Sequence, residues 1–314
     1  MTCSQCDRKE VILLQHGALC KNHFINYFED KVFKTIKKYQ LINRNDKICV
    51  AASGGKDSLT VLYLTKKYLT ENKIETSSLF ALAIDEGIKG YRKTTLTDLK
   101  AFCKKHQITL HIVSNKTEFG HTLDKAYPLI NKQEHKKPCN ICGVWRRHLL
   151  NKYAKRWGAT KVVTGHNLDD EAQVIIMNLF KANSSLAASI GPTAGIEDHA
   201  AFAQRVKPLY FCLEKETKLY SLLKGFQVQF VECPYSGVGY RAHVRDMLND
   251  FEAQYKGTKQ GIVKSFLEIL PLLKEKERTL EKKEMKLCSQ CHEPCQGLIC
   301  NACKIREALK RARK

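Results

Sequence analysis

Residues 53–58, Ser-Gly-Gly-Lys-Asp-Ser, constrain the fold of this chain more than any other segment. They lie between a short apolar run, residues 48–52, and a longer apolar segment that begins at Asp57. Adjacent glycines let successive backbone N–H groups turn toward an anion, and the start of a following helix adds positive potential. A Walker A loop has a different spacing, with four residues between its first Gly and Gly-Lys. The segment therefore predicts a strand, a phosphate-binding turn and a helix.

Segments with strand and helix character alternate along the middle of the chain. Short β-rich runs at 48–52, 79–84, 110–113 and 161–164 precede longer segments of helical character, among them 57–69, 94–106 and 169–180. This alternation is typical of an α/β fold with a doubly wound parallel sheet covered on both faces. Ligands bind at the carboxyl ends of such strands, so residues 53–58, 85–87 and 165–167 are expected to meet at one crevice.

Four further segments complete the predicted organisation. A basic helix is expected over residues 26–39, and a strand over the apolar run 228–233, which ends at Cys233 before Pro234. Residues 181–204 are rich in Ala, Ser and Gly and are predicted to form a loop or lid. Charged residues dominate 274–286, as in a solvated helix.

The charge of the chain indicates a polyanionic partner. Lys and Arg number 53 against 32 Asp and Glu, a formal net charge of +21. Such an excess beside a phosphate-binding turn favours nucleic acid. No apolar run is long enough to span a bilayer, and no signal peptide is recognisable, so we expect a cytoplasmic protein without membrane contact.

Most of the 14 cysteines are closely paired, as in metal sites of reducing compartments. Two terminal units each offer four ligands for a structural Zn²⁺, namely Cys3, Cys6, Cys20 and His23, and Cys288, Cys291, Cys300 and Cys303. His292 or Cys295 could replace one ligand of the second unit. The basic tail that follows it suits contact with a phosphate backbone. Cys49 and Cys103 lie in apolar patterns and are expected to be inert core residues.

A third cysteine group has only three members. Cys139 and Cys142 form one pair, and Cys233 is the nearest unassigned partner. Three thiolates on a metal leave one coordination position open, which suits chemistry better than structure. A catalytic dithiol with Cys233 as the resolving thiol, and a structural zinc with a fourth ligand elsewhere, are the alternatives.

These motifs together resemble the tRNA 2-thiouridine synthetases of the PP-loop ATP pyrophosphatase superfamily. The resemblance covers nearly the whole chain and is carried by residues 53–58, 139–143, 164–172 and 232–234. Residues 85–92 and 142–147 look more like the branch that acts on the wobble uridine than the branch that acts on the T loop. The C-terminal four-cysteine unit is common in the latter branch, so the T-loop position stays open.

The resemblance implies a reaction and its cofactors. ATP and Mg²⁺ would adenylate the oxygen on C2 of a tRNA uridine, and sulfide on a [4Fe-4S] cluster held by Cys139, Cys142 and Cys233 would replace AMP. It also implies a homodimer and a sulfur donor, which could be free sulfide, a persulfide enzyme or a ubiquitin-like carrier. The expected domains are an N-terminal zinc unit (1–25), the PP-loop catalytic domain with the iron-sulfur site (26–273), a charged linker (274–287) and a C-terminal zinc unit with a basic tail (288–314).

Site residues follow from the turn and from the resemblance. Lys56, Asp57 and Asp170 are the expected catalytic residues. The expected ATP-binding residues are Ala51, Ser53, Gly54, Gly55, Lys56, Asp57, Ser58, Ile84, Arg146 and Gly165. Asp169, Asp170 and Glu171 could instead stabilise a helix N-terminus, and His166 is expected to be structural or to face tRNA. Competing functions are another PP-loop ligase or amidotransferase, and a zinc-dependent RNA-binding protein that does not turn over ATP.

Overall fold

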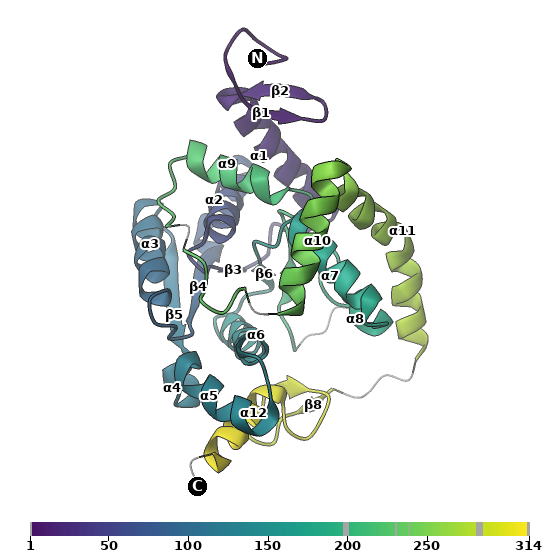
Figure 1. Ribbon diagram of the computed structural model, residues 1–314. Helices are drawn as coiled ribbons and strands as arrows, with labels where there is room; N and C mark the ends of the chain where they lie inside the picture. The colour runs from purple at the N-terminus through teal and green to yellow at the C-terminus, as the bar shows by residue number, and fades with distance from the viewer. Residues whose placement is uncertain (1, 197–200, 230, 238, 281–284, 313–314) are drawn as a thin grey trace.

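The computed structural model describes residues 2–196, 201–229, 231–237, 239–280 and 285–312. Its centre is a five-stranded sheet in the order β5-β4-β3-β6-β7 (Figure 1). The strands are β3 (Ile48–Ala51), β4 (Leu79–Asp85), β5 (Thr109–Ser114), β6 (Lys161–Val163) and β7 (Gln204–Val206), and every neighbouring pair is parallel. The chain order reverses at the central strand β3, which places a ligand-binding switch point there. The predicted α/β fold is confirmed.

Alternate residues of β3 face two different helical layers. Ile48 and Val50 pack with α1 (Lys21–Lys38), α2 (Lys56–Glu71), α3 (Arg92–Lys105) and α9 (Glu214–Leu223). Cys49 faces the other way, toward α5 (Leu123–Glu134), α6 (Pro138–Arg156) and α12 (Asn301–Arg311). Because successive side chains of a strand point to opposite faces, four apolar residues suffice to join both layers.

A separate apolar cluster joins the helices beyond β7. It contains α7 (Leu168–Phe180), α8 (Ser184–Ala188), α10 (Tyr240–Gln254) and α11 (Thr258–Thr279). The predicted loop over 181–204 is therefore only partly right, because α8 buries Ala187 and Ala188 there and β7 begins at Gln204. Residues 197–200 of that stretch lie outside the described residues. The short elements η1 (Thr76–Ser78) and α4 (Asn115–Phe119) complete the main body.

The terminal units lie at opposite ends of the molecule (Figure 1). The N-terminal one is a hairpin of β1 (Glu10–Leu14) and β2 (Gly17–Cys20), and α1 follows at Lys21 rather than at the predicted Asn26, with Cys20 at the N-cap position. The C-terminal one contains β8 (Lys286–Leu287), β9 (Pro294–Cys295) and α12. Between them, α11 ends at Thr279, inside the charged stretch predicted to be helical over 274–286, of which 281–284 lie outside the described residues.

The predicted strand over 228–233 is wrong. Residues 226–229 and 231–233 have no regular secondary structure. Their apolar side chains serve packing instead, since Val228 contacts the α1–α3 layer and Cys233 the α5–α6 layer. A segment that packs against two apolar cores is as apolar in sequence as a buried strand. It need not form the backbone hydrogen bonds that define a strand. Among the described helices, none has the length and apolar content needed to cross a bilayer.

Candidate active site

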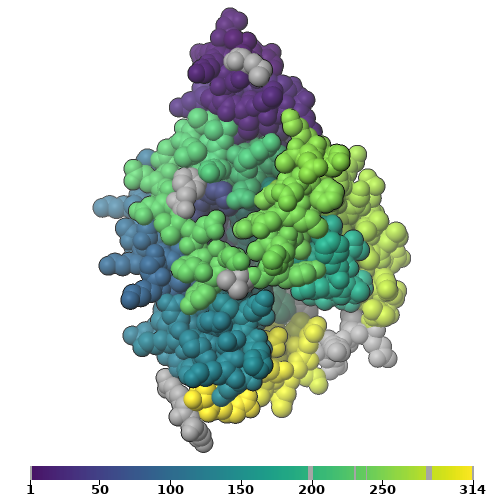
Figure 2. Space-filling model, in the orientation of Figure 1, coloured from purple at the N-terminus to yellow at the C-terminus, as the bar shows by residue number. Residues whose placement is uncertain are grey.

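A cavity of about 290 Å³ opens at the carboxyl edge of the sheet. Figure 2 shows this face of the molecule hollowed between α10 and the segment before it. Three strand ends line the cavity, as predicted: Ser53, Asp57 and Ser58 follow β3, Glu86 follows β4, and Gly165 follows β6. The doubly wound topology therefore brings together residues that are more than a hundred positions apart in the sequence.

The turn after β3 depends on Gly54. Its φ is +88°, and a Cβ there would lie 2.1 Å from the carbonyl oxygen of Thr95. Ser58 holds the turn closed, because its Oγ accepts a hydrogen bond from the Gly54 N–H at 3.0 Å and donates one to the Gly55 carbonyl at 2.9 Å. The first N–H groups of α2 have no partner within the helix, and with the positive end of the helix dipole they suit a phosphate.

Lys56 supplies a fixed positive charge beside the turn. Its Nζ lies 2.9 Å from Oδ2 of Asp57 and 2.8 Å from Oε1 of Glu214, at the start of α9. Burial lowers the pKa of Lys56, but the two carboxylates outweigh this effect and leave its pKa above the usual value. Asp57 also accepts a hydrogen bond from Nδ2 of Asn167 at 3.2 Å. The ammonium group is therefore charged and held at the mouth of the turn.

A row of paired charges links this turn to α6. Arg92 donates to the carbonyl oxygens of Ser53 and Ile84, and its Nε lies 2.9 Å from Oε2 of Glu86. On the other side of Glu86, Nη2 of Arg146 lies 2.8 Å from Oε1. Arg92 is 3 % exposed and Glu86 4 % exposed. Both charges are paired, as buried charges must be, so this network fixes the turn relative to α6.

The start of α7 carries Asp170 into the same cavity. Asp170 and Asn167 form a capping box, in which each side chain accepts a hydrogen bond from the other residue's backbone N–H, at 3.1 and 3.2 Å. The second carboxylate oxygen of Asp170 lies 2.6 Å from Nη2 of Arg241 on α10. Asp170 is therefore both a helix-capping residue and a cavity residue.

The neighbours of Asp170 have purely structural partners. Asp169 is buried against Lys259 of α11, and Glu171 is buried with its Oε1 2.7 Å from Nζ of Lys207. Neither lines the cavity. The interpretation of these two carboxylates as structural, rather than catalytic, is the one that fits. His166 lines the cavity, with its Nδ1 3.0 Å from Oγ1 of Thr164.

The three-cysteine group lies on the far side of Arg146 from the phosphate-binding turn. Cys139 and Cys142 are in the first turns of α6; the Cys139 thiol donates to the Tyr235 carbonyl at 3.5 Å, and Nη2 of Arg146 donates to the Cys142 sulfur at 3.2 Å. Burial raises the pKa of Cys233, and the charge of Cys139 adds to this effect. Cys233, brought in by the irregular segment, is thus an electrostatic neighbour of the α6 pair.

The three-cysteine group differs from the two terminal groups in how far apart its donor atoms lie. Its sulfurs do not gather within 4.8 Å of one another, as the donor atoms of the two terminal groups do. A cubane cluster binds each thiolate to a different iron, so its cysteines stand further apart than those around one zinc ion. Three soft donors also leave one iron of such a cluster without a protein ligand.

Both terminal groups fit one tetrahedral zinc ion each. Cys6 and Cys20 have sulfurs 3.7 Å apart, and Sγ of Cys3 lies 3.2 Å from Nδ1 of His23. In the C-terminal group the sulfurs of Cys291 and Cys300 are also 3.7 Å apart. A Zn–S distance of about 2.3 Å places tetrahedral sulfurs about 3.8 Å from one another. The predicted ligand sets, Cys3, Cys6, Cys20 and His23, and Cys288, Cys291, Cys300 and Cys303, are the ones that come together.

The alternatives for the C-terminal ligands do not fit. The Cys295 thiol donates to the Gly297 carbonyl at 2.9 Å, and neither it nor His292 has a donor atom in the four-cysteine group.

The structure places most predicted nucleotide-site residues around the cavity. Eight of them line it, namely Ala51, Ser53, Asp57, Ser58, Ile84, Arg146, Gly165 and Asp170, and Gly54, Gly55 and Lys56 belong to the turn that borders it. Sequence reasoning placed Glu86 at the crevice as part of 85–87 but gave it no chemical role, and it placed neither Arg241 nor Glu214 in the site and gave Arg92 no role there. For Glu86 the indication was its position directly after a buried strand, since such residues lie at the ligand edge of the sheet; Arg92 is the first residue of α3, and its position gave no such indication.

Comparison with known proteins identifies the family. Residues 25–235 match the model of the PP-loop domain. The chain is 34% identical to the tRNA-5-methyluridine(54) 2-sulfurtransferase of Pyrococcus horikoshii, over 97% of this chain and 93% of that protein. It is 31% identical to the tRNA 2-thiolation protein NcsA of Haloferax volcanii, over 99% of both chains. It is 33% identical to the cytoplasmic tRNA 2-thiolation protein 1 of Aspergillus niger, over 99% of this chain and 89% of that protein.

A solved structure agrees in fold. The U34-tRNA thiolase NcsA from Methanococcus maripaludis, determined with its [4Fe-4S] cluster, has a TM-score of 0.81 and 29% identity, and the match covers 98% of this chain and 96% of that chain. In sequence and in fold, the present chain belongs to the PP-loop family of tRNA 2-thiolation proteins and tRNA 2-sulfurtransferases.

Proposed function

We propose that this protein is an ATP-dependent tRNA uridine 2-sulfurtransferase that activates the C2 oxygen of its target by adenylation. The observation that carries this proposal is the position of Arg146. Its guanidinium pairs with Glu86 in the cavity beside the phosphate-binding turn, and its Nη2 also donates to Cys142. A nucleotide site and a site for a sulfur-carrying metal group therefore share one side chain, which is the arrangement that coupled activation and sulfur transfer needs.

In the adenylation step, the C2 oxygen of the uridine attacks the α-phosphorus of ATP and pyrophosphate leaves. The N–H groups at the start of α2 and the charge of Lys56 would hold the departing pyrophosphate, because they are preorganised before the reaction. Asp57 and Asp170 direct carboxylates into the cavity and are the proposed holders of Mg²⁺. Ala51, Ile84 and Gly165 line the same cavity and would contact the nucleotide through their backbones.

In the second step, sulfur replaces AMP at C2, and the oxygen leaves on AMP. A [4Fe-4S] cluster bound by Cys139, Cys142 and Cys233 would supply the sulfide. Arg146 would neutralise the AMP phosphate while keeping its hydrogen bond to Cys142. The irregular segment with Cys233 and Tyr235 packs against the α6 layer, so it closes one side of the site.

We propose the wobble uridine as the target, with the T-loop uridine as the second candidate. Residues 85–92 and 142–147 support the first, as does the match to the Methanococcus U34 thiolase. The 34% identity to a 2-sulfurtransferase for position 54 supports the second. Mapping 2-thiouridine in tRNA from cells with and without the protein, by nuclease digestion and mass spectrometry, distinguishes the two positions.

The test is thiolation of a tRNA transcript by anaerobically purified protein with ATP and sulfide. Lys56→Gln and Asp57→Asn should each lower the thiolation rate at least about a hundredfold, the order of loss for a preorganised electrostatic group, while tRNA binding is retained. Normal thiolation by these variants would refute the adenylation proposal and leave an RNA-binding protein.

Iron and acid-labile sulfide analysis of the same preparation tests the metal assignment. Wild-type protein should contain a [4Fe-4S] cluster, and Cys233→Ala should lose both the cluster and the activity. Zinc alone at this site, with full activity of Cys233→Ala, would contradict the assignment.

The remaining proposals concern the sulfur donor, the oligomeric state and the location of the protein in the cell. Replacing free sulfide in the assay by a persulfide enzyme or by a ubiquitin-like carrier identifies the sulfur donor. Sedimentation of the holoprotein tests the proposed homodimer. The name of the Aspergillus relative supports a cytoplasmic location, which imaging of the tagged protein tests.

A further inference from the structure

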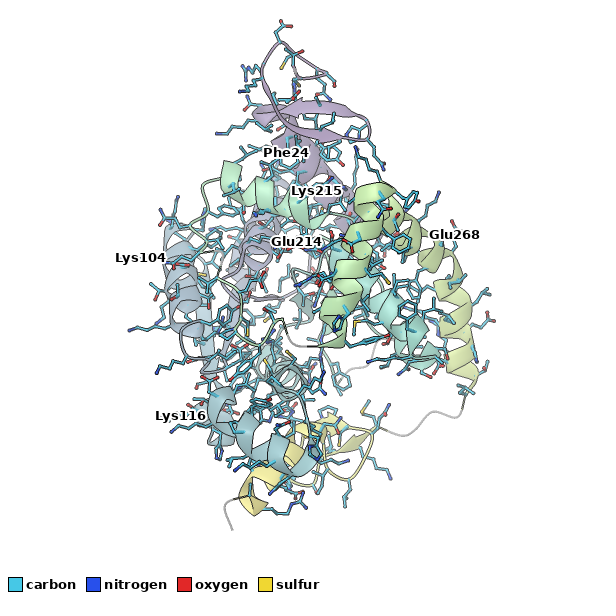
Figure 3. All side chains as sticks on the ribbon, viewed as in Figure 1. Phe24, Lys104, Lys116, Glu214, Lys215 and Glu268 are labelled. Atoms are coloured by element: carbon cyan, nitrogen blue, oxygen red, sulfur yellow. The ribbon has the colours of Figure 1, made fainter. Side chains whose placement is uncertain are left out.

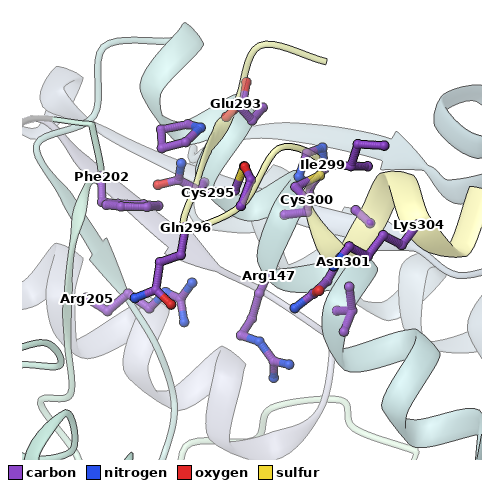
Figure 4. A pocket seen from close by; sticks show the side chains of 16 residues that line it. Arg147, Phe202, Arg205, Glu293, Cys295, Gln296, Ile299, Cys300, Asn301 and Lys304 are labelled. Carbon is purple, nitrogen blue, oxygen red and sulfur yellow. The ribbon is translucent and has the colours of Figure 1, made fainter. Parts of the chain in front are cut away.

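A second cavity lies beside the active site, and we call it the C-terminal groove. Its volume is about 550 Å³, and it lies between α6, the segment 202–205 and the C-terminal zinc unit (Figure 4). It shares no lining residue with the active site, yet α6 serves both. Arg146 and Leu150 line the active site, whereas Arg147 and Asn151, the next residues along the helix, line the groove. The two cavities are therefore neighbours across one helix.

The strand side of the groove is equally close to the active site. Arg205 lines the groove, and the next residue, Val206, pairs with Val163 of β6. Thr164, which follows Val163, already lines the active site. The end of β6 therefore lies close to both cavities.

The charge of the groove is strongly positive. Arg147, Arg205 and Lys304 line it, and Glu293 is the one carboxylate among its lining residues. Burial lowers the pKa of Arg205, and the nearby charge of Arg147 adds to this effect. Within the described parts of the chain, none of the three cations has an acidic partner within ion-pair distance. Two like charges that face each other without a counterion leave room for an anion.

The other lining groups suit a nucleotide better than an isolated phosphate. Phe202 is 37 % exposed and lines the groove, as does Gln296. An exposed aromatic ring can stack on a base, and the amide of Gln296 can hydrogen bond to its edge. The volume is within the range of about 300–1,000 Å³ that is usual for pockets of small ligands.

We propose that the C-terminal groove binds an RNA nucleotide next to the target uridine, with Arg147 and Arg205 on its phosphate and Phe202 against its base. This inference rests on the proposed function, because it takes the RNA substrate from there. The groove then has a positioning role. It holds the RNA on one side of the target while the target uridine itself occupies the active site.

The test compares tRNA binding by the full-length wild type and its variants. The double variant Arg147→Gln/Arg205→Gln should bind an unmodified tRNA transcript about tenfold more weakly or worse. The slope of log affinity against log salt should become less negative by about 0.7 for each phosphate that the variant no longer neutralises. Phe202→Leu should weaken binding about fivefold or more, the order expected for one stacked base. Lys104→Gln, on the outer side of α3 (Figure 3), is the matched charge control and should bind like the wild type.

A chemical change in the RNA locates the binding position. Transcripts with a neutral methylphosphonate beside uridine 34, and a second series beside uridine 54, cover both candidate targets. In one series the neutral linkage should weaken binding to the wild type but cause no further loss in the double variant. Equal losses in both proteins, or no loss in either series, would overturn the placement beside the target.

ATP binding without RNA separates this inference from the proposed function. It should be equal in the wild type, in Phe202→Leu and in the double variant. Loss of ATP binding with unchanged tRNA binding would make the groove a site for free nucleotides and overturn the proposal. Unchanged tRNA binding by the double variant would overturn it as well. If the wild type binds tRNA as described but does not thiolate it, the proposed function fails and the groove remains an RNA site.

Discussion

At the scale of single residues, the phosphate-binding turn shows how two adjacent glycines differ in what they do. Gly54 has φ +88° and no space for a Cβ, because the Thr95 carbonyl would lie 2.1 Å away. Gly55, at the N-cap of α2, has φ −80°, and the nearest atom to its Cβ would be Oγ of Ser53 at 3.5 Å. The first glycine is required by the backbone, and the second is not.

We therefore expect Gly54→Ala to lower the free energy of unfolding by about 2 kcal/mol or more, since a left-handed backbone costs about 1–2 kcal/mol before the clash with Thr95 is counted. Gly55→Ala is the control and should change it by less than about 0.5 kcal/mol. Urea denaturation measures both. Equal stability of the two variants would contradict the strained geometry at Gly54.

His148 gives a residue-scale prediction about pH. Burial and then the charge of Lys152 lower the pKa of His148 to about 4. The unfolded chain, with a histidine pKa of about 6.5, takes up this proton first as the pH falls. The stability that comes from the neutral imidazole is therefore complete above pH about 6.5 and is lost as the pH falls toward about 4.

The variant His148→Gln should consequently lose less stability than the wild type between neutral pH and about pH 5, by about 2 kcal/mol. Protonation of the zinc ligands affects both proteins, so the difference between them isolates the histidine. Denaturation at the two pH values gives that difference, and parallel pH profiles would show that the pKa of His148 is not depressed in the folded state.

At the scale of elements, α7 is fixed by buried charge on two sides. Asp169 pairs with Lys259 of α11, and it also accepts a hydrogen bond from the Glu214 N–H of α9 at 2.7 Å. Lys259 is 5 % exposed and Asp169 7 % exposed. Because α7 also presents Asp170 to the active site, this pair sets the position of a cavity carboxylate from outside the cavity.

Lys259→Met should lower the free energy of unfolding by about 3–5 kcal/mol, because it leaves the buried Asp169 charge without its counter-charge. The double variant Asp169→Asn/Lys259→Met should recover part of this loss. Arg245→Gln breaks an exposed pair with Asp246 and should cost less than about 1 kcal/mol. Thermal and urea unfolding measure all three, and a loss of similar size in Lys259→Met and Arg245→Gln would count against a structural role for the buried pair.

At the scale of the whole molecule, the C-terminal zinc unit is part of the main core rather than an appendage. Cys288, Cys300, Ile305 and Leu309 belong to the same apolar cluster as Phe80 and Leu82 of the sheet. A chain segment of this length cannot fold around its own core, so the metal and the α5–α6 layer support it together.

Cys291→Ser should therefore lower the melting temperature of the whole protein by about 10 °C, which corresponds to roughly 3 kcal/mol in a domain of this size. Cys295→Ser, outside the zinc group, should melt like the wild type. Calorimetry measures the melting temperatures, and zinc analysis measures the metal content of each variant. A separate low-temperature transition, with an unchanged main transition, would mean that the unit unfolds by itself.

Much of this architecture was predictable because local patterns specify it. The period and length of the apolar runs predict β3–β6 and the helices α2, α3 and α7, and the spacing of close cysteine pairs predicts both zinc groups. The strand over 228–233 was wrong because an apolar run that bridges two cores looks like a buried strand. The helix start at Lys21 was missed because a zinc ligand, Cys20, occupies the cap position.

The sequence alone determined the chemistry that this chain carries: a phosphate-binding turn, two complete sets of four metal-ligating residues and a third set with three thiolates. It did so because backbone geometry and metal coordination depend on residues close together in the chain. Only the tertiary structure decided which of these groups lie next to one another. The charge row Arg92–Glu86–Arg146, the pairing of Asp170 with Arg241 and the groove between Arg147 and Arg205 each join segments far apart in the sequence. Such contacts depend on which faces pack together, and no local pattern encodes that choice.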